Sequence, residues 1–168
     1  EHDLIKNNQK LTINDISIKT ISDPGHTPEG IIYILDDLAF TGDTLFIESI
    51  GRPDLGQDSR ENAPILFNTL HEKILTLPEN TKVLPAHYSE KIQLEKNIPI
   101  TSTLKELKEN LNILKLNKEQ FTDFIIKNTN PKPGNFETIK KINKGLINTI
   151  DIDEIRELEA GPNRCAVN

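Results

Sequence analysis

Three polar residues lie in loops rich in glycine or proline, each directly after a strand-like segment. His26 stands in "SDPGHTPEG", Asp43 in "FTGDTLF" and His87 in "LPAHY". Loops held by a rigid scaffold are where binding and catalytic residues concentrate. Two imidazoles and one carboxylate at strand ends suit a first-row metal such as zinc or iron. The alternative is structural: His26 hydrogen-bonds its own turn, and Asp43 caps the segment that follows.

Two residues close to these loops could act on a substrate. Arg52 follows Gly51 in the loop after Asp43. Its guanidinium could hold a substrate carboxylate, or it could pair with Asp54 and only stiffen the loop. Tyr88 could donate a hydrogen bond to a bound sulfur or oxygen species, and it could equally be a packed aromatic.

The other histidines and the single cysteine are expected to be structural. His2 lies in a polar leader and His71 on a charged helix, so both are expected to face solvent. A catalytic thiol needs a nearby positive group to lower its pKa. Cys165 has at most Arg164 beside it, and the sequence therefore favours a structural role.

The segments that must position the first two loops have the pattern of strands. Isoleucines and leucines alternate on both sides of Asn14-Asp15, which predicts a hairpin. The run "IIYIL", a turn at "DD" and the return run "LAFT" predict a second hairpin. Apolar residues at helical spacing predict a helix over 60–75, and a short buried strand over 82–84 leads to His87.

Beyond Pro99 the pattern changes to helices with explicit caps. Thr103 with Glu106 and Asn117 with Gln120 are capping boxes. The helix that starts at Thr103 is expected to carry a single apolar stripe. Further helices are expected in the tail, separated by residues that break or stop a helix. The residues concerned are Leu104, Leu107, Leu111 and Leu114 for the stripe, Asn135 as the third cap, Pro131 and Pro133 as breakers, and Gly145 as a stop.

Composition excludes several classes of function. The net charge of −6 argues against a general nucleic-acid surface, which needs a basic face. No apolar run approaches the roughly 20 residues that span a bilayer. One cysteine cannot form an internal disulfide, so a cytoplasmic setting is expected. The chain starts at Glu1 and has no methionine, which suggests that its natural start is missing.

The three motifs, in this order and at these separations, resemble the second half of the metallo-β-lactamase fold. In that superfamily a His-x-His-x-Asp-His run in the first half supplies most of one metal site. The His of a Gly-His-Thr loop, the Asp of a Gly-Asp-Thr loop and a late His complete the set, and they match His26, Asp43 and His87. The resemblance covers roughly residues 10–90.

This resemblance implies an α/β fold, the C-terminal half of a metallo-β-lactamase αββα sandwich with a helical C-terminal tail. Residues 1–100 would be the second half of the metallo-β-lactamase-like domain, and 101–168 a helical extension packing on it. No His-x-His-x-Asp-His run occurs in the sequence. The missing N-terminal half of the same protein is therefore an expected partner.

Within the superfamily, "IGRPDL", "LPAHY" and "GPNRCAV" resemble the persulfide dioxygenases and their rhodanese-fused relatives. That branch implies Fe(2+) held by His26, Asp43 and a first-half histidine, with His87 close by. The reaction would be oxidation of a low-molecular-weight persulfide, such as glutathione persulfide, to sulfite and thiol.

Two alternatives remain. A zinc hydrolase of the glyoxalase II type would use one or two Zn(2+) ions, with Asp43 bridging and His87 as a ligand. A non-catalytic fragment or regulatory module needs no metal. The expected partner is a small thiol or persulfide substrate. Neither nucleic acid nor a membrane is expected as a partner. A homodimer is also compatible with the sequence.

Overall fold

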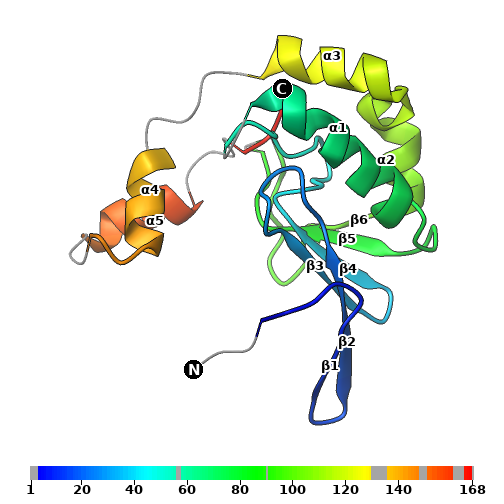
Figure 1. The fold of residues 1–168 in the computed structure, drawn as a ribbon. Helices are drawn as coiled ribbons and strands as arrows, with labels where there is room; N and C mark the ends of the chain where they lie inside the picture. The colour runs from blue at the N-terminus through cyan, green and yellow to red at the C-terminus, as the bar shows by residue number, and fades with distance from the viewer. Residues whose placement is uncertain are drawn as a thin grey trace.

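One six-stranded sheet organises the part of the chain that carries the three loops (Figure 1). The computed structural model describes residues 4–55, 58–89, 91–129, 136–147, 151–160 and 165–167. The strands lie in the sheet in chain order, and β4 and β5 are the one parallel pair among those described. Their bounds are β1 (Lys10–Ile13), β2 (Ile16–Ser22), β3 (Ile31–Leu35), β4 (Leu38–Gly42), β5 (Lys82–Pro85) and β6 (Ser102–Thr103).

The two predicted hairpins are confirmed. β1 pairs with β2, and β3 pairs with β4, both antiparallel. Asn14 has φ 52° and Asp36 has φ 51°, which are left-handed conformations. Asn and Asp tolerate this region better than other residues with a Cβ atom, so the turn residues suit the backbone that the hairpins need.

A helical crossover joins the parallel strands β4 and β5, as a parallel connection requires. The helix α1 (Ser59–Thr69) begins at Asp58, whose carboxylate accepts a hydrogen bond from Arg60 N. The sequence predicted one helix over 60–75. Its last turn is instead a π-helix (Leu70–Ile74), in which Leu75 N donates to Leu70 O at 2.8 Å.

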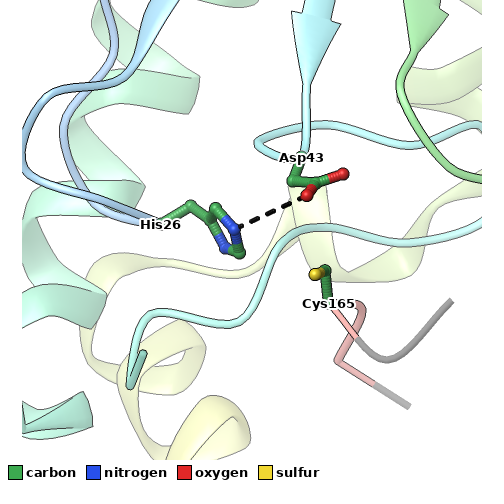
Figure 2. A group of neighbouring side chains, drawn as sticks. All are labelled: His26, Asp43 and Cys165. Carbon is green, nitrogen blue, oxygen red and sulfur yellow. Dashed lines mark ion pairs between the residues drawn. The ribbon is translucent and has the colours of Figure 1, made fainter. Parts of the chain in front are cut away.

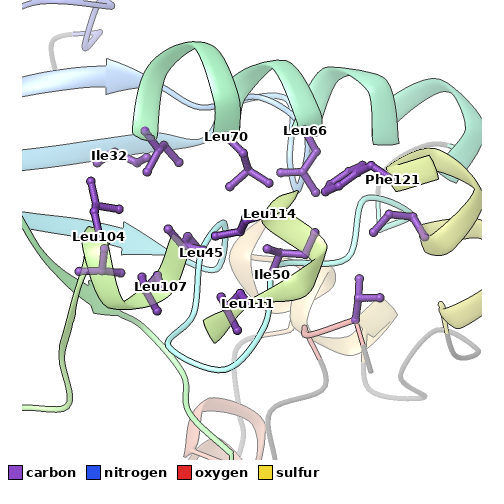
Figure 3. Packing of buried hydrophobic residues seen from close by; sticks show 14 of the residues in the cluster. Ile32, Leu45, Ile50, Leu66, Leu70, Leu104, Leu107, Leu111, Leu114 and Phe121 are labelled. Carbon is purple, nitrogen blue, oxygen red and sulfur yellow. The ribbon is translucent and has the colours of Figure 1, made fainter. Parts of the chain in front are cut away.

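The core lies between the sheet and the helices (Figure 3). Phe121 of α3 (Lys118–Asn128) packs edge-on against Phe67 of α1, with ring centroids 5.4 Å apart. Burying each large apolar side chain stabilises the fold by roughly 1.5–3 kcal/mol. Fully buried members of the core include Ile32, Leu45, Leu66, Leu70, Val83, Leu104, Phe121 and Ile125.

The predicted apolar stripe is buried, but it does not belong to one helix. α2 (Leu104–Asn110) starts with the predicted capping box of Thr103 and Glu106 and ends before Leu111, which is extended with φ −90° and ψ 101°. A 3-10 helix (Asn112–Lys115) then carries Leu114. The capping box at the start of α3 is also confirmed. The extended residue turns the chain, so both short helices face the same core.

The other face of the sheet carries apolar side chains that are less covered. Tyr33, Phe40 and Leu84 are in register across β3, β4 and β5 and therefore share a face. Phe40 is 40% exposed, and the other two are partly exposed. In contrast, Ala39 and Val83 on the opposite face are fully buried.

Two further helices are described in the tail, α4 (Phe136–Asn143) and α5 (Ile152–Ala160) (Figure 1). Gly145 has φ 68°, and Leu146 N donates to Lys141 O, so the predicted glycine stop is confirmed. Asn135, Pro131, Pro133, Arg164 and His2 lie outside the described residues. The division at residue 100 stays a prediction.

His71 corrects one expectation. Its ring stacks on Phe67 with centroids 4.0 Å apart, and its Nε2 is buried without a hydrogen-bond partner. Burial lowers the pKa of His71, so the ring is a packed neutral imidazole rather than a solvent-facing one. Separately, none of the described helices has the length and apolar character needed to cross a bilayer.

Candidate metal centre

His26 lies in the loop between β2 and β3 and is 7% exposed. Its Nδ1 is 2.7 Å from the backbone oxygen of Arg52. A carbonyl oxygen only accepts, so Nδ1 must carry the proton and donate it. The lone pair is then on Nε2, which faces Asp43. An outer hydrogen bond of this kind orients a histidine and fixes its tautomer as a metal ligand.

Asp43 and His87 follow neighbouring parallel strands, and this is why they meet. Gly42 at the end of β4 is paired with Pro85 at the end of β5, and Ala86 N donates to Gly42 O at 2.9 Å. The next side chains along both strands therefore emerge at one sheet edge. His87 Nδ1 donates to Asp43 Oδ1 at 2.5 Å.

The second oxygen of the same carboxylate completes the arrangement. Asp43 Oδ2 is 3.9 Å from His26 Nε2 (Figure 2). The structure thus brings together all three residues that the sequence proposed as metal ligands. Their role as ligands stays a prediction.

Close backbone contacts hold this loop cluster together. A Cβ atom added to Gly51 would lie 1.9 Å from Asp43 O and 2.9 Å from His26 Nδ1. A Cβ atom on Gly25, which has φ 136°, would lie 2.5 Å from Leu66 Cα. Both positions therefore need glycine. A side chain at Gly51 would push apart the segments that carry His26 and Asp43, and one at Gly25 would push the His26 loop away from α1.

The electrostatics favour the protonation states that a metal needs. Burial lowers the pKa of His26, although the charge of Asp43 opposes the effect. Burial alone would raise the pKa of Asp43, but the hydrogen bond and charge of His87 outweigh it and lower that pKa. The pair is thus a neutral imidazole beside an ionised carboxylate, which are the metal-binding forms.

Asp23 is a buried carboxylate that the sequence did not single out, and it links the loop of His26 to the loop of Asp43. Asp23 is 2% exposed and accepts a hydrogen bond from Thr44 Oγ1 at 2.5 Å. Its burial raises its pKa to about 6, against a weaker opposing effect of Thr44. Asp23 precedes "PGH" and Thr44 follows Asp43, so this bond ties the histidine loop to the aspartate loop. The sequence signal for this bond was the presence of a short polar residue beside each motif, Asp23 before "PGH" and Thr44 after Asp43.

Arg52 is 2% exposed, and its side chain is paired with Asp54. Nε donates to Oδ1 at 2.6 Å and Nη2 to Oδ2 at 2.7 Å, a bidentate contact. This geometry supports the alternative in which Arg52 stiffens the loop, and the stiffened loop presents the carbonyl that orients His26. A contact of Arg52 with substrate stays a prediction.

Tyr88 is 42% exposed and lies beside the cluster rather than within it. It lines a cavity of about 490 Å³ together with residues of the loop after Asp43, the 3-10 helix and α3. Tyr88 can therefore reach a molecule in that cavity. Its predicted hydrogen bond to substrate is not tested by this geometry. Other lining residues are Phe46, Glu48, Leu111, Phe124 and Val167.

Cys165 is the site neighbour that sequence reasoning assigned to a structural role. Its Sγ, a ring nitrogen of His26 and a carboxylate oxygen of Asp43 all lie within 4.8 Å of one another (Figure 2). Burial, and then the charge of Asp43, raise the pKa of Cys165 to about 12, so the group is a thiol. The sequence did not predict that Cys165 lies beside Asp43, because no local pattern links two residues so far apart in the chain.

The donor set fits a divalent first-row metal. A histidine with a fixed tautomer and an ionised carboxylate face each other, and a second histidine holds the carboxylate. Imidazole suits zinc and iron alike, and a carboxylate completes either site. His26 and Asp43 would hold the ion, with His87 either supporting Asp43 or binding a second ion.

The chain is similar to known proteins over part of its length. No protein-family model matches the chain. The chain is similar to the mitochondrial persulfide dioxygenase ETHE1 of Bos taurus, with 34% identity over 131 residues, 77% of this chain and 48% of that protein. It is also similar to the hydroxyacylglutathione hydrolase of Dictyostelium discoideum, with 34% identity over 114 residues, 63% of this chain and 39% of that protein. The chain spans less than half the length of either relative.

Solved structures show the same fold. A metallo-β-lactamase from Staphylococcus aureus superposes with a TM-score of 0.76 and 30% identity over 89% of this chain and 46% of that chain. ETHE1 from Myxococcus xanthus superposes with a TM-score of 0.72 and 24% identity, over 84% and 59% of the two chains. The resemblance to the metallo-β-lactamase superfamily and the α/β fold class are confirmed.

Proposed function

We propose that this relative of the metallo-β-lactamases provides part of the metal centre of an iron-dependent enzyme that oxidises a low-molecular-weight persulfide. The observation that carries the proposal is the facing pair of His26 Nε2 and Asp43 Oδ2, in a chain 34% identical over 131 residues to a persulfide dioxygenase. Two histidines and one carboxylate are typical of mononuclear iron oxygenases that keep open positions for their reactants. The coarser conclusion, a metal-dependent enzyme, rests on the same pair.

The reaction balances with one water. The persulfide, dioxygen and water give the thiol, sulfite and two protons; the outer sulfur is oxidised and dioxygen is reduced. The bound Fe(2+) would supply the positions at which dioxygen and sulfur meet in a fixed orientation. Burial keeps His26 neutral, its bond to the carbonyl of Arg52 fixes its tautomer, and Asp43 stays ionised beside His87. Tyr88 and the cavity that it lines would bind the thiol carrier.

The remaining ligand is proposed to come from a first half that carries the His-x-His-x-Asp-His run. The αββα sandwich has two sheets, and the described residues form one. The apolar side chains of Tyr33, Phe40 and Leu84 on its less covered face are suited to packing against a second sheet. "The complete protein" below means the chain together with that half. A cytoplasmic location and a homodimer remain predictions.

A zinc hydrolase of the glyoxalase II type is the second candidate. One specific observation favours it: the two oxygens of Asp43 face two different histidines, as a carboxylate bridging two ions would. In that case His26, Asp43 and His87 would hold zinc, and the zinc would supply an activated water for the hydrolysis of a thioester. The similarity to a hydroxyacylglutathione hydrolase also supports this candidate, at the same 34% identity as the similarity to the persulfide dioxygenase.

Metal analysis of the complete protein, combined with two assays, separates the candidates. One iron per chain with oxygen consumption on glutathione persulfide supports the dioxygenase. Two zinc ions with thioester hydrolysis would replace it with the hydrolase. Metal-free, inactive protein would contradict both and favour a non-catalytic module.

The variant Asp43→Ala tests the site itself. It should weaken metal binding by more than the roughly 100-fold that loss of an outer-shell partner can cost. Asp37→Ala is a matched control, because Asp37 lies before β4, at the opposite end from Asp43, and pairs only at the surface with Lys82 at 3.4 Å. Unchanged metal stoichiometry in Asp43→Ala would remove Asp43 from the ligand set.

A further inference from the structure

We propose that Cys165 is a positioning residue of the metal centre: its thiol holds the Asp43 carboxylate in the orientation that faces His26. The inference rests on the proposed function, because it assigns a role within the same site. Cys165 lies near the end of the sequence, and its position depends on a long-range pairing of the backbone.

The segment 165–167 is fixed against the loop that follows Asp43. Gly51 and Ala166 form an antiparallel bridge. Arg52 N donates to Cys165 O at 2.7 Å, and Val167 N donates to Ile50 O at 3.0 Å. Val167 is 5% exposed and belongs to the hydrophobic core. The backbone on both sides of the thiol is therefore anchored.

The same loop also orients His26. The carbonyl of Arg52 accepts the hydrogen bond from His26 Nδ1, and the amide of Arg52 donates to Cys165. One residue thus connects the histidine to the cysteine through its backbone. Both side chains approach Asp43 from segments that the loop 50–52 holds in place (Figure 2).

The thiol contacts Asp43 directly. Its Sγ lies within 4.8 Å of a carboxylate oxygen of Asp43, and the S–H donates a hydrogen bond to that carboxylate. His87 Nδ1 donates to Oδ1 of the same group at 2.5 Å. A carboxylate with two donors has less freedom to rotate about its side-chain bonds, so its Oδ2 is kept toward His26 Nε2. Hydrogen-bonded ligating carboxylates are typical of metal sites, and removing such a partner costs 10–100-fold in metal affinity.

The test uses the complete protein and Co(2+), whose absorption spectrum reports its ligands. Cys165→Ala removes the donor, and Cys165→Ser replaces it with a hydroxyl that can still donate. Val167→Ala loosens the same segment without touching Asp43. Co(2+) affinity is measured by calorimetry, and the melting temperature of the metal-free protein reports folding.

We expect Cys165→Ala to weaken Co(2+) binding roughly tenfold, the low end for a weak donor, and Cys165→Ser to restore most of the affinity. Val167→Ala should lower the melting temperature of the metal-free protein and change the affinity less than Cys165→Ala does. The parent spectrum should lack an intense near-ultraviolet thiolate-to-cobalt band.

Three results would overturn the inference. Equal affinity in the parent and Cys165→Ala would remove the role. A thiolate-to-cobalt band lost in both cysteine variants would make Cys165 a ligand instead. A weakening in Val167→Ala as large as in Cys165→Ala would make the effect structural. Cys165-dependent Co(2+) binding without oxygen consumption by the iron-loaded protein would leave this inference standing and refute the proposed reaction alone.

Discussion

Gly51→Ala is the sharpest test of how the loops assemble the site. The added Cβ atom would start 1.9 Å from Asp43 O, whereas ordinary contacts begin at 3.4 Å. The two backbones must therefore separate by about 1.5 Å. Overpacking of this kind costs roughly 1–3 kcal/mol. For a chain of this size, 1 kcal/mol shifts the melting temperature by roughly 2–4 °C, so a decrease of about 2–12 °C is expected.

The same displacement should affect the metal. Gly51 lies between Asp43 and the carbonyl that orients His26, so the facing pair is pulled apart. A misplacement of 1 Å can cost on the order of 100-fold in activity, and a loss of similar size is expected here. The assays are calorimetric metal titration, persulfide-dependent oxygen consumption and thermal unfolding followed by circular dichroism.

Gly145→Ala is the matched control. Unlike Gly51, Gly145 has a positive φ, of 68°, but a Cβ atom there meets nothing within 4 Å. Alanine there should cost roughly 1–2 kcal/mol through backbone strain alone and leave metal affinity unchanged. The reasoning is refuted if Gly51→Ala binds metal like the parent and melts within the range of Gly145→Ala.

Two further predictions concern Asp23 and Arg52, the buried charged residues that hold the loops of the site. Burial raises the folded-state pKa of Asp23 to about 6 from 3.8, so its contribution to stability is fully present below about pH 4 and is lost as pH rises through about 6. Asp23→Asn should remove roughly 3 kcal/mol of this decline, measured by urea unfolding between pH 4 and 7; an unchanged pH profile would contradict the assignment. Arg52→Lys should destabilise the fold by roughly 1–3 kcal/mol, because an ammonium cannot reproduce the bidentate pairing with Asp54. Denaturation equal to the parent would show that the paired guanidinium is dispensable.

The sequence alone carried much of the local structure. The turns at Asn14 and Asp36, the capping box at Thr103 and the stop at Gly145 depend on near neighbours in the chain, and the structure confirms them. Strand-like runs before His26, Asp43 and His87 also predicted that these residues end strands. The meeting of Asp43 with His87 followed once β4 and β5 were parallel neighbours, because such strands end at one edge.

Only the tertiary structure decided the contacts between segments that are distant in the sequence. Leu111 has the spacing of a helix residue, yet it is extended because the chain must turn both short helices toward one core. Cys165 lies beside Asp43 because the segment 165–167 pairs with residues 50–52. Asp23, which follows β2, reaches Thr44, which follows β4, although β3 lies between these two strands. Periodicity and propensity act over a few residues, whereas these contacts depend on sheet register and packing, which the whole chain determines together.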